Sequence, residues 1–154
     1  MITLSTTIEI KGKSPQQIYD WMLDLDDGKY KRWHREHLEW KTLKRTPDVV
    51  GTEVFFDEWI GRLRFRFRGK IAEAIPDRLL KYELKYPIPA YFSIELEPQQ
   101  SGTRVIHTVG FGYRGLAGRL LDVAFRITPV FWYFKREMDR HAREEFTNLK
   151  DVAS

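Results

Sequence analysis

The chain has 154 residues, of which 42% are apolar and 14% aromatic, a composition that excludes an intrinsically disordered protein. It contains no cysteine, which excludes disulfides and thiolate ligands, so any metal site must use His, Asp or Glu. The net charge of +4 is compatible with nucleic acid or an anionic membrane only if the cations gather on one surface. At this length we expect a single domain over residues 1–154, with a core large enough to enclose a pocket.

The first segment, MITLSTTIEIKGK, predicts a short alternating strand over residues 3–10. It has neither the basic nor the apolar region of a signal peptide, so we expect a cytoplasmic location. The following segment, SPQQIYDWMLDLDDG, predicts a helix that ends at Gly28. Ser14 is placed as its N-cap, Pro15 as its first residue, and Gln17 completes a capping box.

Residues 38–111 are predicted to form about six successive strands separated by short turn signals. The connections are too short for helical crossovers, which indicates an antiparallel meander. Within it, GRLRFRFRGK alternates arginines with apolar residues and predicts one strand with a solvated cationic face. No phosphate loop, zinc-finger spacing or RNA-recognition signature accompanies this run, so we expect no nucleic-acid partner.

The last third changes to a helical period. It predicts a short amphipathic segment over residues 116–127, and then a long helix with Thr128 as cap, Pro129 as first residue and an end near Asn148. The apolar stretch over residues 115–136 is edged by arginine and lysine. We expect buried core with a basic outer face; the alternative is peripheral contact with an anionic membrane. The continuous run from 127 to 134 is only eight residues long, too short to span a bilayer.

Together these elements predict an α+β fold in which a curved antiparallel sheet of about seven strands wraps around the long C-terminal helix. The segments STTIEIKGKSPQQIYDWMLD, GTEVFFDEWIGRLRFRFRGKIAEAIPDRLLKYEL and SGTRVIHTVGFGY resemble the START-like superfamily of helix-grip domains, which includes polyketide cyclases and lipid-transfer domains. The resemblance covers essentially the whole chain. It implies the helix-grip fold and an internal cavity for an apolar or aromatic small molecule, and by itself implies no reaction.

The predicted C-terminal helix places His141 and Glu145 one turn apart on its apolar side. This spacing lets both side chains reach one metal ion or hydrogen-bond each other; the alternative is an ion pair near the helix end. On the strand TEVFFDEWI, alternation puts Glu58 on the apolar face with Val54 and Phe56. An unpaired carboxylate there would cost several kcal/mol, so Glu58 should be protonated, paired with a cation or bound to a metal.

The remaining histidines lie in two other segments. His107 shares a strand face with Val109 and is either a core residue or a hydrogen-bonding group in a cavity. His34 and His37, in RWHREHLEW, form either a polar surface turn or part of a site. Two His and two Glu without Cys match a nitrogen and oxygen site for zinc, the cofactor that we expect.

The segments WHREH, FDEW and HAREE also resemble a narrower family, the diacetylphloroglucinol and phloretin hydrolases. These enzymes cleave a carbon–carbon bond between an aromatic ring and an acyl group. That resemblance implies zinc ligands at His34, Glu58, His141 and Glu145. His34 is preferred as the ligand with His37 beside the substrate, and the alternative is that His37 is the ligand. We assign catalytic roles to His37, as general acid, and to His107. This chain is shorter than those hydrolases.

The substrate implied by this family is an aromatic or polyketide-like ketone. The predicted pocket wall consists of Trp33, Phe56, Tyr82, Tyr91, Phe111, Phe134 and Met138. The alternative function is a non-catalytic carrier for a lipid or other apolar molecule.

Overall fold

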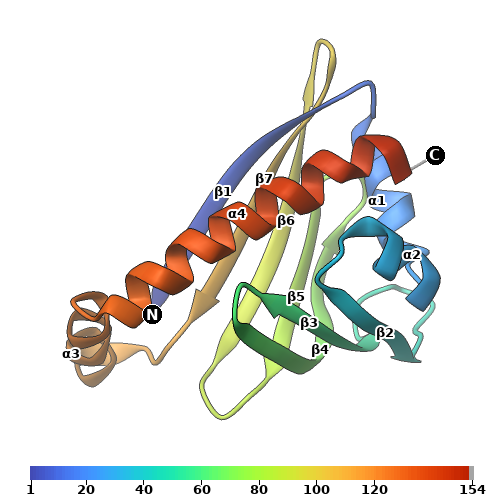
Figure 1. The fold of residues 1–154 in the computed structure, drawn as a ribbon. Coiled ribbons are helices and arrows are strands. Elements are labelled where there is room, and N and C mark those ends of the chain that lie inside the picture. Colours follow the sequence, from blue (N-terminus) through green and yellow to red (C-terminus); the bar gives the residue numbers. More distant parts are fainter. Residues whose placement is uncertain (153–154) are drawn as a thin grey trace.

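The computed structural model describes residues 1–152 and has an α+β fold, in which a seven-stranded antiparallel sheet curves around a long C-terminal helix (Figure 1). The sheet order is β1-β7-β6-β5-β4-β3-β2. The predicted helix-grip architecture is therefore confirmed. The strands are β1 (Ile2–Lys11), β2 (His37–Lys44), β3 (Glu53–Ile60), β4 (Leu63–Ile75), β5 (Leu79–Lys85), β6 (Ala90–Gln99) and β7 (Gly102–Phe111).

Four helices complete the fold: α1 (Pro15–Leu23), α2 (Asp27–Trp33), α3 (Gly115–Arg126) and α4 (Pro129–Val152). The predicted capping box of α1 is present, with Ser14 and Gln17 bonding each other's backbone N–H groups. The prediction that this helix continues to Gly28 is wrong. The side chain of Asp26 accepts a hydrogen bond from the N–H of Lys29 and starts a separate helix, α2.

Helix α4 contacts β1, at one edge of the sheet, and β3, next to the other edge. The hydroxyl of Thr128 accepts a hydrogen bond from the N–H of Phe131, as predicted for the N-cap of this helix. The helix continues beyond the predicted end at Asn148, to Val152. α4 packs against β1 and α2. Residues from the first and the last segments of the chain are therefore in contact. One face of α4 is fully buried, including Ala142, Phe146 and Leu149.

The contact between β6 and β7 includes one glycine at which an added side chain would collide with a tyrosine ring in its present position. A Cβ atom added to Gly110 would lie 2.1 Å from the ring of Tyr91, its partner across the sheet. We therefore expect Gly110→Ala to lower the free energy of unfolding by roughly 1–3 kcal/mol, measured by urea denaturation. The same substitution in a Tyr91→Ala background should cost much less. An equal cost in both backgrounds would contradict this interpretation.

Helix α3 differs from the expectation of a buried core. It lies at one end of α4, beyond the end of β7 (Figure 1). Gly118 is its only buried residue, while Leu116 is 75% and Ile127, just after the helix, 79% exposed. The prediction that residues 115–136 form core with a basic outer face is therefore wrong for α3. Within the described chain, no helix is both long enough and apolar enough to cross a membrane.

Candidate metal centre

The sheet and α4 enclose an apolar cavity of about 290 Å³. Of the predicted pocket residues, six contribute to its wall: Trp33, Phe56, Tyr82, Phe111, Phe134 and Met138. Tyr91 does not. Successive residues of a strand face opposite sides, so Tyr91 lies on the outer side of β6, against Gly110 and beneath the ammonium group of Lys81. Phe92 takes the inward position.

Three of the predicted metal ligands reach the cavity wall: Glu58, His141 and Glu145. Glu58 lies on the inner face of β3, and His141 and Glu145 lie one turn apart on α4. His37 begins β2 and is paired directly with Glu58 in the sheet register, which brings these two side chains together. The strand pairing and the helix spacing thus converge on one group of four side chains.

His37 presents one ring nitrogen to both carboxylates. Its Nδ1 donates to the backbone carbonyl of Tyr30 at 2.9 Å, so in the neutral ring Nε2 carries the free lone pair. Nε2 is buried and has no hydrogen-bond partner among the described residues. It lies 3.5 Å from a carboxylate oxygen of Glu58 and 3.6 Å from one of Glu145.

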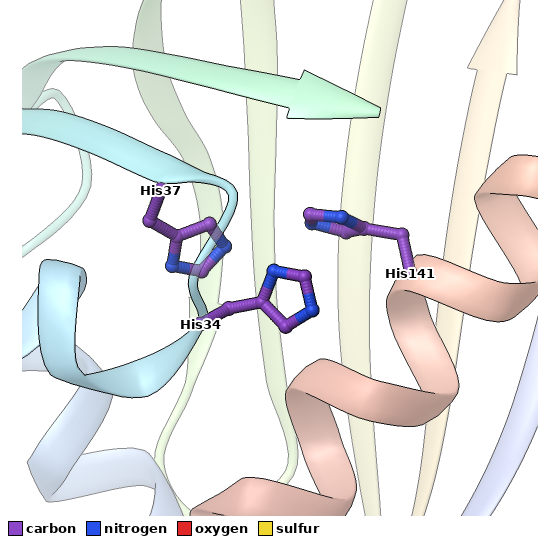
Figure 2. A group of neighbouring side chains, drawn as sticks. All are labelled: His34, His37 and His141. Atoms are coloured by element: carbon purple, nitrogen blue, oxygen red, sulfur yellow. The ribbon is translucent and has the colours of Figure 1, made fainter. Parts of the chain in front are cut away.

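His141 is arranged in the same way from the opposite side. Its Nδ1 donates to a carboxylate oxygen of Glu36 at 2.9 Å, and the guanidinium of Arg140 holds both oxygens of that carboxylate. The Nε2 atom of His141 is likewise buried and without a partner in the described part of the chain. It lies 3.9 Å from Glu58 and 4.0 Å from Glu145. Figure 2 shows a nitrogen of His37 and one of His141 facing each other.

His34 is close to both rings but uses its nitrogens elsewhere. The three imidazoles offer ligand atoms within 4.8 Å of one another. However, Nδ1 of His34 accepts the N–H of Glu36 at 3.2 Å, and its Nε2 lies 3.0 Å from a carboxylate oxygen of Glu144. The position facing the two carboxylates, which was predicted for His34, is taken by His37. Neither histidine is among the residues that line the described cavity.

Burial shifts the protonation of this group. It lowers the pKa of His37 to about 2 and that of His141 to about 4, so both rings are neutral at pH 7. Burial also raises the pKa of Glu58 to about 7 and that of Glu145 well above its usual value. The phenol of Tyr30 donates to Glu58 at 2.6 Å. Two buried carboxylates beside two neutral imidazoles form a site that favours a cation.

The four donors fit a zinc ion in kind, and the four nitrogen–oxygen separations between them are close to those of a zinc site. Zinc binds neutral imidazole and carboxylate with bonds of about 2.0–2.2 Å, so neighbouring donors of a tetrahedral site lie roughly 3.3–3.6 Å apart. The nitrogen–oxygen separations here, 3.5 to 4.0 Å, are close to those edges. Glu36 would orient His141 by the carboxylate–histidine contact that commonly supports a metal ligand. A bound cation would give the two unpartnered Nε2 atoms a partner.

His107 lies in the cavity wall, between Phe92 and Phe146, with ring centroids 6.2 and 5.5 Å away. Burial lowers its pKa to about 4, so the ring is neutral.

Four residues that hold the cluster were not predicted from the sequence: Tyr30, Glu36, Arg140 and Glu144. The only signal available was adjacency, since Glu36 lies between the two histidines and Arg140 precedes His141.

No protein-family model matches this chain, and no curated protein matches it in sequence. Solved structures do match. TTHA0849 from Thermus thermophilus is 14% identical with a TM-score of 0.68, over 99% of this chain and 97% of that one. The di-domain ARO/CYC protein StfQ of the steffimycin biosynthetic pathway is 11% identical with a TM-score of 0.72, over 99% of this chain and 50% of that one.

Ara h 8.0201 also matches, at 12% identity and a TM-score of 0.53, over 88% of this chain and 97% of that one. At such identities the likeness concerns the fold alone. The chain has the START-like helix-grip fold, with an internal apolar cavity.

Proposed function

We propose that this chain is a zinc-dependent hydrolase that cleaves a carbon–carbon bond of an aromatic or polyketide-like ketone inside the cavity. One observation carries the proposal: the Nε2 atoms of His37 and His141 are buried, lack hydrogen-bond partners among the described residues and face the carboxylates of Glu58 and Glu145. The assigned ligands are therefore His37, Glu58, His141 and Glu145. His37 replaces His34 in the set inferred from sequence, and His34 becomes a supporting residue.

The chain's own residues divide the remaining work. The aromatic wall, including Phe56, Phe92 and Phe134, suits a flat ring and keeps bulk water away from it. Zinc held by these residues would supply Lewis-acid polarisation of a substrate oxygen that reaches it from the cavity and adds to the four protein ligands. Hydrolysis adds the elements of water, so that the acyl carbon gains a hydroxyl group and the ring carbon gains a proton. Tyr82 and His107 lie in the cavity wall and are the candidates for donating that proton or for orienting the ketone.

Elemental analysis of protein purified without added metal tests the site. We expect about one zinc per chain in the wild type and its loss in His37→Ala, because the free lone pair of Nε2 is removed. His34→Ala is the matched control, since both of its nitrogens are already hydrogen-bonded, and it should keep its zinc. Circular dichroism would verify that each variant is folded. Zinc lost from His34→Ala and retained in His37→Ala would restore the ligand set inferred from sequence.

A second function, that of a non-catalytic carrier, is favoured by a different observation: the cavity wall is overwhelmingly apolar. Mass spectrometry of the purified protein separates the two. A metal-free wild type that co-purifies with an apolar molecule would support the carrier function and contradict the hydrolase proposal. Incubation of the zinc protein with an acylated polyphenol, followed by detection of the free acid and the deacylated ring, would support the hydrolase.

A further inference from the structure

Helix α3 turns its apolar stripe away from the protein. Three positions at i, i+4 and i+7 attach it: Gly118 is buried against the backbone of Tyr113, Asp122 pairs with the N-terminal ammonium group of Met1, and Phe125 packs on Phe111. A second stripe has the same spacing but begins two residues before Gly118. At about 100° per residue it is rotated by roughly 200° from the attached side of the helix. It consists of Leu116, Leu120, Val123 and Ile127, all exposed.

A surface helix of a soluble protein normally directs such a stripe into the core. Here three further apolar side chains, Leu121 of α3 and Val130 and Trp132 near the α3–α4 junction, are also more than half exposed. We call this set the α3 surface: Leu116, Leu120, Leu121, Val123, Ile127, Val130 and Trp132. Contiguous exposed apolar surface of this kind marks an interaction site.

The charges around the α3 surface are positive. Arg119 and Arg126 flank the outward stripe, and Arg114 and Lys135 lie just before α3 and early in α4. None of these four cations forms a salt bridge with a described residue, whereas the one acidic side chain of α3, Asp122, is occupied by Met1. An apolar face with a cationic border is the arrangement of helices that lie in the surface of an anionic membrane.

The α3 surface also adjoins the cavity. Val130 belongs to both, being exposed and contributing to the cavity wall, and Phe125 of α3 lies in the wall as well. Across the cavity, Tyr86 and Ile88 between β5 and β6 are exposed wall residues too. Apolar side chains therefore continue from the α3 surface into the cavity.

We propose that the α3 surface docks this protein on an anionic lipid bilayer and places the mouth of the cavity against it. Apolar ligands dissolved in the bilayer can then reach the cavity without crossing water. A second copy of the chain fits less well, because a symmetric contact through α3 would bring the unpaired Arg119 and Arg126 of both copies together. The inference does not depend on the metal site.

Vesicle co-sedimentation with the full chain tests the proposal. We expect binding to vesicles of phosphatidylcholine and phosphatidylglycerol, weaker binding at high salt, and little binding to phosphatidylcholine alone. The double variant Leu120→Glu and Ile127→Glu should weaken binding at least roughly tenfold, and Arg119→Glu with Arg126→Glu likewise. Both pairs are exposed, so folding should be retained, as circular dichroism can verify.

Matched controls are available on the sheet. Leu43 on β2 is an exposed leucine and Arg68 on β4 an exposed arginine, and replacing either by Glu should leave vesicle binding unchanged. Absence of binding, equal binding to neutral vesicles, or equal loss in the control variants would overturn the proposal. Sedimentation equilibrium adds a further test. A dimer that Leu120→Glu and Ile127→Glu dissociate, without vesicle binding by the wild type, would assign the surface to a second copy instead.

Discussion

Glu58→Gln is expected to make the metal-free protein more stable at pH 8, by roughly 3 kcal/mol, while abolishing its stabilisation by zinc. Burial raises the pKa of Glu58 from 4.5 to about 7 in the folded protein. The unfolded chain therefore releases this proton at lower pH than the folded chain does. Stability is lost as the pH rises from about 4.5 through 7, and the full cost is present above pH 7. Glutamine cannot ionise and avoids that cost.

Urea denaturation in a metal chelator measures this effect at several pH values. Wild type and Glu58→Gln should differ most at pH 8 and little below pH 4.5. His37 and His141 have lowered pKa values and contribute in the opposite sense, but they are present in both proteins and largely cancel in the comparison. Glu95→Gln is the matched control on an exposed carboxylate, expected to change stability by less than about 0.5 kcal/mol. A wild type more stable than Glu58→Gln at pH 8 without metal would contradict the prediction.

Excess zinc should reverse the order of stability. Zinc at about 1,000 times its dissociation constant stabilises a folded protein by roughly 4.1 kcal/mol, which exceeds the cost of the buried carboxylate. The wild type should show this gain and Glu58→Gln should lack it. The same carboxylate thus destabilises the metal-free protein and binds the ion when zinc is present.

Glu36→Gln is expected to weaken zinc binding roughly 10- to 100-fold while leaving the four proposed ligands intact. Glu36 accepts the Nδ1 proton of His141 and is held by Arg140, which fixes both the orientation of the ring and the nitrogen left free. Glutamine keeps the size of the side chain but removes its negative charge. Competition against a chromophoric zinc chelator measures the affinity.

Glu137→Gln provides the control for this experiment. Glu137 also accepts a hydrogen bond from Arg140, at 3.1 Å, but has no hydrogen bond to His141. We expect its replacement to leave zinc affinity nearly unchanged. If both variants lose affinity equally, Glu36 acts only by holding Arg140 in place, and the proposed role in orienting His141 fails.

The local sequence was sufficient for most of the fold. Alternation marked the strands, and the caps at Ser14 and Thr128 marked where α1 and α4 begin. Short-range periodicity also put Glu58 on the inner face of β3 and His141 and Glu145 on the inner face of α4, because a residue's face is fixed by its spacing from its neighbours. Helix α2 was missed because its cap, Asp26, lies inside a run that continues the pattern of α1.

The choice between His34 and His37 could not be made in this way. The two residues straddle the end of α2 and the start of β2, where neither the helical nor the strand period applies. Their directions are set by distant partners. Glu144 on α4 engages His34, while the register of β2 with β3 places His37 opposite Glu58. Both are contacts between segments that only the folded chain brings together.

The difference between local periodicity and contacts of distant segments also explains why α3 was predicted to be buried. Its sequence determined an amphipathic helix with a basic border, just as the chain's composition determined the donor set: histidine and glutamate, with no cysteine. Which side of α3 is covered was decided by tertiary structure. Gly118 against Tyr113 and Asp122 on Met1, at the other end of the chain, attach the side opposite to the leucines. The sequence of a helix predicts an apolar stripe. Which side of the helix the rest of the protein covers depends on packing between segments that are distant in the sequence.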